Sequence, residues 1–279
     1  MEALRRLSAR DRQKYLVRNW RRVKGSREAS DRAAALARLR PWVDKARRFS
    51  GWDFPGIQLR ELESGLPWDY EGVVRNHAAE PRNVFDLGTG GGERLARLRP
   101  QLPERIVATE EWDVNAPVAF RRLAPLQVHV VRAKSVRLPV KDASFDLVVD
   151  RHEEFDPEEV ARVLAPGGSF VTQQVGQHDW IELRRFFPRM IEFGDQRSAY
   201  SKAFLRRGFA VESVEHDRRV AYPSLGELTF MLLVTPWTIP DFDVERDLDA
   251  LLAFESEQLA EDGVVVTECR YLIRARKPA

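Results

Sequence analysis

The chain has 279 residues, of which 43% are hydrophobic and 32% charged, a balance typical of a folded globular protein with one large core. No apolar run approaches the roughly 20 residues that cross a bilayer, which excludes a transmembrane helix. The single cysteine, Cys269, has no partner for an internal disulfide, and the basic, polar opening residues differ from a secretory signal. We therefore expect a cytoplasmic protein.

Positive charge is concentrated at the front of the chain. Residues 1–53 contain 16 Lys and Arg against 6 Asp and Glu, or +10, whereas the whole chain carries +2, so the remainder carries −8. Apolar residues recur at helical spacing between Leu36 and Ala46, which predicts a helix there. We expect residues 1–52 to form a basic helical extension and residues 53–279 to form the main domain.

The main domain begins with a helix capped by Asp69 and continues as an alternation of short β-branched runs and helical segments. Such alternation is typical of a parallel sheet with crossover helices. Further helices are predicted after Asp156-Pro157, where a capping carboxylate precedes a proline, and at residues 198–207 and 244–259. The predicted strands are residues 84–87, 105–109, 128–131, 145–149, 169–172, 210–215 and 264–274.

The segment 84–95 gives the strongest indication of a ligand. An apolar strand ends at Asp86, and glycines follow at alternate positions before a helix begins. These glycines are Gly88, Gly90 and Gly92. Glycines there let the backbone turn tightly and approach a ligand more closely than any Cβ would permit. Because Glu93 stands where the dinucleotide fingerprint needs glycine, a pyrophosphate ligand is disfavoured.

A second indication is the acid that follows the next strand. Glu110 lies about one β-α-β step beyond the glycine loop, where a carboxylate can accept hydrogen bonds from both ribose hydroxyls. This position favours an adenosine. A solvated strand end is the alternative, and the adjacent Glu111 leaves the register open by one residue.

Four segments, in this order, resemble the successive motifs of class I S-adenosylmethionine-dependent methyltransferases: residues 86–92, Glu110, residues 138–149 and residues 162–168. The resemblance is strong over residues 83–175. It implies an α/β fold with a doubly wound, seven-stranded, mostly parallel sheet whose last strand is antiparallel. It also implies S-adenosylmethionine as the cofactor, lying across the carboxyl ends of the first strands.

The resemblance also implies which residues bind the cofactor. Asp86 and Gly88 would lie near the methionine part, and Glu110 would hold the ribose. Trp112 would cover the adenine face, with an exposed Trp at a helix start as the alternative. The complete predicted set is Asp86, Gly88, Thr89, Gly90, Gly92, Glu110, Trp112, Lys134, Ser135 and Asp150.

One position departs from the family pattern. Many relatives have an Asp where this chain has Lys134, and that Asp accepts a hydrogen bond from the adenine amino group. A lysine cannot accept, so the resemblance leaves this contact to backbone groups or to Ser135.

The residues after the fourth strand lie where open α/β sheets bind their ligands. His152 is the candidate general base, because an unperturbed imidazole is largely neutral near pH 7; a strand-end His bonded to a neighbour is the alternative. Arg151 either binds an acceptor carboxylate or pairs with Glu153 or Asp150. The five histidines show no paired ligand spacing, so no metal site is predicted.

These observations favour an enzyme that methylates a small-molecule acceptor on oxygen, nitrogen or carbon. The alternative is an RNA methyltransferase whose basic extension tracks phosphates and stacks on bases. Against it, the main domain is acidic and lacks a motif for a flipped amino base. A third class is a module that binds the cofactor without catalysis. The residues behind the RNA alternative are Arg5, Arg6, Arg10, Arg12, Lys14, Tyr15, Arg18, Trp20, Arg21, Arg22 and Lys24.

Overall fold

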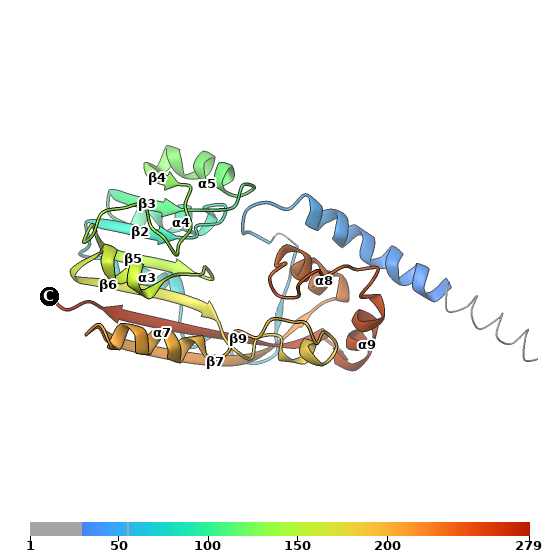
Figure 1. The fold of residues 1–279 in the computed structure, drawn as a ribbon. Coiled ribbons are helices and arrows are strands. Elements are labelled where there is room, and N and C mark those ends of the chain that lie inside the picture. Colours follow the sequence, from blue (N-terminus) through green and yellow to red (C-terminus); the bar gives the residue numbers. More distant parts are fainter. Residues whose placement is uncertain (1–29, 55) are drawn as a thin grey trace, which may run out of the picture.

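A central sheet with helices on both faces organises the protein, as the computed structural model shows for residues 30–54 and 56–279 (Figure 1). The strands are β1 (Arg60–Glu61), β2 (Asn83–Leu87), β3 (Arg105–Thr109), β4 (Val128–Val131), β5 (Phe145–Arg151), β6 (Leu164–Val175), β7 (Ala210–Tyr222), β8 (Leu259–Ala260) and β9 (Gly263–Arg276). The helices are α3 (Tyr70–His77), α4 (Glu93–Leu98), α5 (Ala116–Leu123), α6 (Pro157–Val163), α7 (Gln196–Leu205), α8 (Leu225–Val234) and α9 (Leu248–Gln258). Residues 30–47 form a further helix.

The strand order confirms the predicted doubly wound sheet. It runs β1-β7-β9-β6-β5-β2-β3-β4, with β8 paired to β9. Strands β2 to β6 pair in parallel, whereas β9 is antiparallel to both β6 and β7. The seven longer strands are those predicted from the sequence, and the two-residue strands β1 and β8 are additions at its margins.

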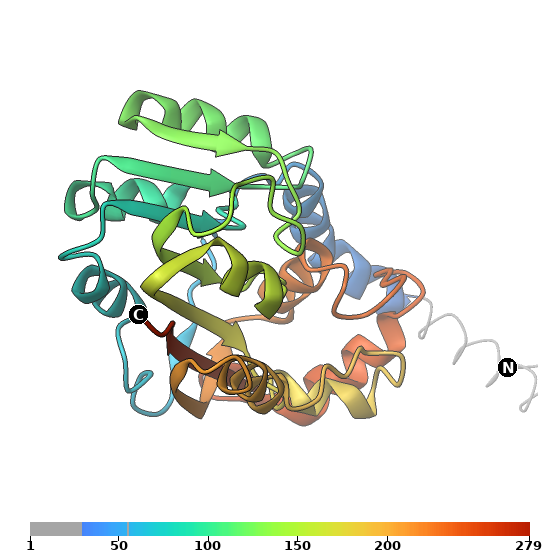
Figure 2. The ribbon, with the colours of Figure 1, turned by 60° about the vertical axis from the view of Figure 1, so that its left-hand side comes forward.

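Two layers of helices cover this sheet (Figure 2). Helices α3, α4 and α5 bury their apolar side chains on one face, and α6 and α7 on the other. Both predicted capping aspartates are confirmed: Asp69 accepts from the backbone N–H groups of Glu71 and Gly72, and Asp156 accepts from that of Glu158. Among the described residues, no helix combines the length and apolarity needed to span a membrane.

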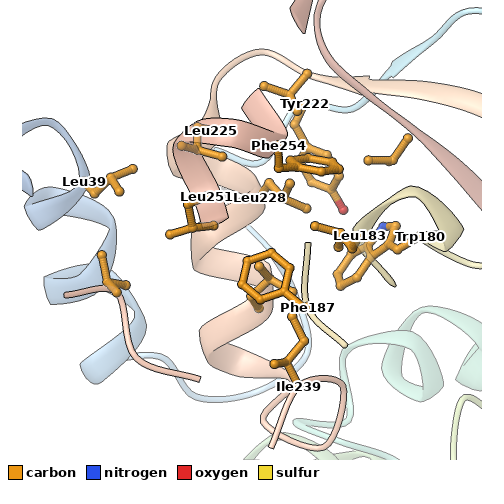
Figure 3. Close-up of a cluster of buried hydrophobic side chains, with 14 of the residues drawn as sticks. Leu39, Trp180, Leu183, Phe187, Tyr222, Leu225, Leu228, Ile239, Leu251 and Phe254 are labelled. Carbon is orange, nitrogen blue, oxygen red and sulfur yellow. The ribbon is translucent and has the colours of Figure 1, made fainter. Parts of the chain in front are cut away.

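Strands β7 and β9 continue beyond the rest of the sheet and hold a separate apolar cluster with α8, α9 and residues 30–47 (Figure 1). Leu39, in the helix at residues 30–47, is fully buried and points toward Leu225 and Leu251 (Figure 3). Two ion pairs at the edge, Arg32–Asp249 at 2.6 Å and Arg38–Glu255 at 2.7 Å, join this helix to α9. The described part of the predicted extension is therefore packed against the main domain.

A charged section of β9 separates this cluster from the core under α3 and α4. On one face of the strand, Val266 belongs to the outer cluster and Leu272 to the inner core. Between them, on the same face, lie Glu268 and Arg270, because side chains two apart in a strand share a face. These charges form part of the floor of a cavity between the two apolar clusters.

Candidate functional site

A cavity of about 500 Å³ opens at the carboxyl ends of β2, β5 and β6. This volume lies within the range of small-molecule sites. Asp86 and Gly88 line it at the end of β2, and Arg151 and His152 line it at the end of β5. The cavity therefore brings together the predicted methionine contacts and both predicted catalytic residues.

The glycine loop between β2 and α4 has the conformation that its sequence predicts. Gly88, Gly90 and Gly92 have φ values of 60°, 61° and 77°, in the left-handed region where a side chain is strained. The end of β3 fixes the loop, because Thr109 accepts from the N–H of Thr89 at 2.8 Å and, through its hydroxyl, from that of Gly88 at 3.2 Å. The end of β3 thus holds the loop, through both its backbone and the Thr109 hydroxyl.

Glu110 points into this loop. One carboxylate oxygen accepts from the N–H of Gly90 at 2.7 Å, and the other from the N–H of Trp112 at 2.9 Å. Burial raises the pKa of the Glu110 carboxyl, and these two hydrogen bonds oppose that shift. Glu111 instead lies 3.9 Å from Lys134, so of the two adjacent acids Glu110 is the one that faces the loop.

Asp86 is the second carboxylate at this end of the cavity. Burial raises its pKa to about 7, and the nearby charge of Arg94 opposes the shift. A carboxyl with such a pKa is easily ionised by a positively charged ligand. Asp86 therefore suits an ammonium group better than a neutral one.

Glu153 is a residue of this site that the sequence reasoning missed. Its side chain lies so close to Gly88 that a Cβ on that glycine would collide with it. Burial, followed by the charge of Glu110, raises the pKa of the Glu153 carboxyl to about 7. The sequence signal was its place in the acidic turn after the fourth strand.

Asp150 stabilises this turn from the protein interior and does not line the cavity. Its carboxylate accepts from the N–H of Glu153 at 3.2 Å and from the side-chain amide of Gln174 at 3.1 Å. Its burial raises the pKa well above the usual range. The predicted contact of Asp150 with the cofactor stays a prediction, and the structure places its side chain in the interior.

His152 lies beside Gln173 at the end of the cavity floor. The indole N–H of Trp68 donates to the Gln173 carbonyl oxygen at 2.9 Å, so the amide nitrogen faces the imidazole Nε2 at 3.3 Å. This arrangement makes Nε2 the acceptor and places the imidazole proton on Nδ1. Burial and the charge of Arg151 lower the pKa of His152 well below its usual value, so the ring is neutral.

Arg151 pairs with neither of the acids considered for it. Among the residues that the structure describes, no carboxylate lies within 4.0 Å of its guanidinium, and its Nε atom is buried without a hydrogen-bond acceptor. A partly buried cation without a carboxylate partner is costly for a folded protein. This arginine is therefore suited to bind an anion.

The adenine side of the predicted site lies outside the cavity lining. Trp112 is 37% exposed and packs edge-on against Trp52 and Trp237, at centroid distances of 6.5 and 5.4 Å. Ser135 is buried, and its hydroxyl lies 3.4 Å from that of Thr109. Lys134 is exposed and lies 3.9 Å from Glu111. Of the predicted cofactor contacts, it is the one whose position least resembles that of a ligand-binding residue.

Trp52, the last residue of the predicted extension, was also missed as a site residue. It stacks on Trp237 at 6.0 Å, and a Cβ at Gly90 would lie 2.9 Å from the Trp52 Cβ. Next to it, the N–H of Gly51 donates to the Asn115 side chain at 2.8 Å. The segment after the helix at residues 30–47 thus covers the glycine loop. The aromatic run from Phe49 to Phe54 was the available signal.

Replacing Trp52 by Ala should weaken the binding of S-adenosylhomocysteine, the demethylated cofactor, by about tenfold and lower stability by about 2 kcal/mol. The reason is the loss of ring contacts that hold this segment over the glycine loop. Calorimetry and thermal unfolding measure the two effects. W52F retains a ring and should lie between wild type and W52A, whereas unchanged affinity in W52A would show that the segment does not cover the site.

One cluster outside the cavity has the ligand types of a metal site. The donor atoms of His178, Asp217 and Cys269 lie within 4.8 Å of one another. His178 Nδ1 and the Asp217 carboxylate are 2.8 Å apart, and burial raises the pKa of the Cys269 thiol. Cys269 lies on the opposite face of β9 from Glu268 and Arg270. This cluster is thus separate from the cavity.

Comparison with known proteins agrees with this geometry. Residues 84–168 match a family model described as a methyltransferase domain. The fold is similar to the YcgJ protein from Bacillus subtilis, at 17% identity and TM-score 0.58 over 75% of this chain and 98% of that one. It is also similar to a candidate methyltransferase from Bacillus halodurans C-125, at 19% identity and TM-score 0.56 over 75% and 99%.

A third similar structure is the [4+2]-cyclase SpnF, at 14% identity and TM-score 0.53 over 86% of this chain and 93% of that one. Among curated proteins, none matches the sequence. At such identities the likeness extends to the fold alone, and the name of the cyclase shows that this fold is not confined to one reaction. The reaction must therefore be argued from the site.

Proposed function

We propose that the protein transfers a methyl group from S-adenosylmethionine to a small-molecule acceptor, because residues 84–168 match a methyltransferase domain and the glycine loop suits that cofactor. The observation behind this proposal is the position of the glycine loop, held by Glu110, at one end of a cavity of about 500 Å³. The acceptor would bind in the remainder of that cavity, beside Arg151 and His152.

The residues around the loop fit the cofactor in charge and shape. Asp86 would accept from the α-ammonium group, and Glu110 retains lone pairs for the ribose hydroxyls beyond the two that bind backbone N–H groups. The absence of side chains at Gly88 and Gly90 leaves room for the cofactor chain. When bound, S-adenosylmethionine supplies an electrophilic methyl group on a positively charged sulfonium.

Cofactor binding requires Glu153 to turn away from Gly88, because its side chain lies over that glycine. A glutamate at the end of a turn can rotate about its own side-chain torsions, so no strand has to move. Its carboxylate, together with Asp86 and Glu110, makes this end of the cavity acidic. That charge favours a cofactor carrying an ammonium and a sulfonium group over neutral nucleosides.

On the acceptor side, the residues position the group that attacks the methyl carbon. Methyl transfer is an in-line displacement, so holding the acceptor beside the sulfonium accounts for much of the rate. Because Nδ1 carries the ring proton, the neutral His152 ring can accept the proton that the acceptor loses only at Nε2, once the Gln173 amide has released that nitrogen. Its lowered pKa makes it a weak base, which suits an acceptor that releases its proton easily, or after the new bond has formed.

The test is direct measurement of cofactor binding and methyl transfer. The purified protein should bind S-adenosylhomocysteine in calorimetry and should convert S-adenosylmethionine to it in the presence of a small-molecule extract of cells. Protein that binds neither compound would contradict the proposal. Binding without any methyl transfer would instead favour the non-catalytic module.

The RNA alternative rests on the basic residues before Gly25, which lie outside the described part of the chain. The cavity favours a small molecule, because its lining includes apolar side chains such as Ile57, Leu66 and Met231. Retention of the protein on RNA that falls steeply with added salt would support the alternative; absence of retention at low salt would remove it.

A further inference from the structure

We propose that the methyl acceptor carries an oxyanion, either a carboxylate or a phosphate, and that the guanidinium of Arg151 binds it. This inference rests on the proposed function, because it names the chemical class of the acceptor for the same cavity. A guanidinium presents parallel N–H groups that match two oxygens of a carboxylate or phosphate.

The charges around the cavity single out Arg151. Six arginines line it: Arg94, Arg97, Arg151, Arg184, Arg218 and Arg270. Within the described residues, the five others each have a carboxylate within 4.0 Å, whereas Arg151 has none. Its Nε is buried and unsatisfied as well. One cation is thus left for a group that the protein does not supply.

The neighbours of Arg151 increase the attraction for an anion. Burial, followed by the like charges of Arg94 and Arg270, lowers its pKa to about 9, so the guanidinium remains protonated at neutral pH. An anion here would also approach Arg94 and Arg270, which pair with Glu71 and Asp179 at 2.7 and 2.5 Å. Arg94 and Arg270 would stay in their ion pairs, and Arg151 would supply the N–H donors that bind the anion.

The rest of the cavity indicates an apolar body on the same acceptor. Apolar side chains from two separate segments, residues 52–59 and 190–193, line it, and several of them are partly exposed there. They are Trp52, Phe54, Ile57, Leu59, Met190, Ile191 and Phe193. Burial of an apolar group against such side chains contributes affinity without specificity, while the guanidinium fixes orientation. An aromatic or aliphatic acid, or its phosphate counterpart, has both features.

The test compares benzoate, phenyl phosphate and the neutral benzyl alcohol by calorimetry, with the protein alone and saturated with S-adenosylhomocysteine. We expect one of the two anions to bind at least about tenfold more tightly than the alcohol, and Arg151→Met to abolish that difference. Arg151→Lys should retain part of it. Which anion binds more tightly distinguishes a carboxylate acceptor from a phosphate acceptor.

Arg105→Met is the matched control, because Arg105 is exposed at the start of β3 and lies outside the cavity lining. It should leave the anion preference unchanged. Without ligand, Arg151→Met should unfold at a higher temperature than wild type, since it removes a partly buried charge that has no carboxylate partner. A lower unfolding temperature would point to a structural role for Arg151.

Three results would overturn the inference. The alcohol could bind as tightly as both anions, or the anion preference could persist in Arg151→Met. Alternatively, Arg151→Met could weaken S-adenosylhomocysteine itself by tenfold or more, in which case Arg151 holds the carboxylate of the cofactor. If wild type fails to bind S-adenosylhomocysteine, the proposed function fails separately, and the anion series on the protein alone still tests Arg151.

Discussion

Replacing Glu110 by Ala should weaken S-adenosylhomocysteine binding by about a hundredfold, the largest loss expected from any single side chain of this site. Two effects add in the same direction. The variant loses the predicted carboxylate contacts to the ribose, and it leaves the N–H of Gly90 without the acceptor that it has at 2.7 Å. An unsatisfied donor in the loop also loosens the loop that the cofactor must contact.

Glu111→Ala is the matched control for this experiment, because the two acids are adjacent and only Glu110 faces the loop. It should change the affinity by less than about threefold, as expected for a partly exposed charge whose nearest cation is 3.9 Å away. Glu110→Gln keeps the volume but replaces one acceptor by a donor, so it should fall between wild type and Glu110→Ala. Equal losses at both positions would mean that the affinity depends on the total negative charge near the loop and not on specific hydrogen bonds from Glu110 to the ribose.

The sheet was the part of the structure most readable from the sequence, because buried parallel strands form continuous apolar runs between turn residues. The strands at 105–109 and 128–131 have the predicted bounds. Strand β7 was predicted to end at Glu215 but continues to Tyr222. Charged residues in its second half belong to the strand because they pair across it, as Arg218 does with Glu268 of β9.

Helix α9 was predicted to begin at Val244 but begins at Leu248. Asp243 accepts from the N–H groups of Glu245 and Arg246, and Asp247 accepts from that of Asp243. These short side-chain bonds hold a turn where a helix would otherwise start. A hydrophobic period alone does not reveal such competition.

The site was predictable where it depends on local sequence. The left-handed glycines and the strand-end acid follow from residues within one β-α-β unit. Trp52 and Glu153 had only indirect signals, an aromatic run and an acidic turn. Their contact with the glycine loop was not predictable, because each reaches it through the packing of distant segments. The sequence also could not predict that Arg151 lacks a carboxylate partner. Asp150 and Glu153 are close to it in the sequence, and only the fold shows that both side chains face elsewhere.

Asp86 should make cofactor affinity depend on pH. Its carboxyl has a pKa of about 7 because it is buried, and a nearby ammonium and sulfonium would stabilise the ionised form. Binding should therefore release a proton, and the affinity for S-adenosylhomocysteine, which keeps the ammonium, should rise by up to about tenfold from pH 6 to pH 8. Calorimetry in two buffers of different ionisation enthalpy measures the proton release.

Asp86→Asn should weaken binding by about thirtyfold at pH 8 and remove much of this pH dependence. The remainder should come from Glu153, whose pKa is also about 7, and should disappear when Glu153→Gln is added. The two carboxyls act in the same direction, because each is neutral at low pH and attracts a cation only when ionised. Undiminished pH dependence in the double variant would assign the titration to other groups.

The Asp86→Asn substitution should also change the stability of the protein without ligand. The folded-state pKa of Asp86 lies above the ordinary value of 3.8, so the folded protein binds this proton more tightly than the unfolded chain does. Its contribution to stability is therefore complete below about pH 4 and is lost as the pH rises through about 7. Asp86→Asn should unfold at a higher temperature than wild type at pH 8, and this advantage should shrink toward pH 5. A weaker ligand affinity together with a more stable free protein is the combination expected of a carboxylate kept for a cationic ligand, because a purely structural aspartate would lose stability on the same change.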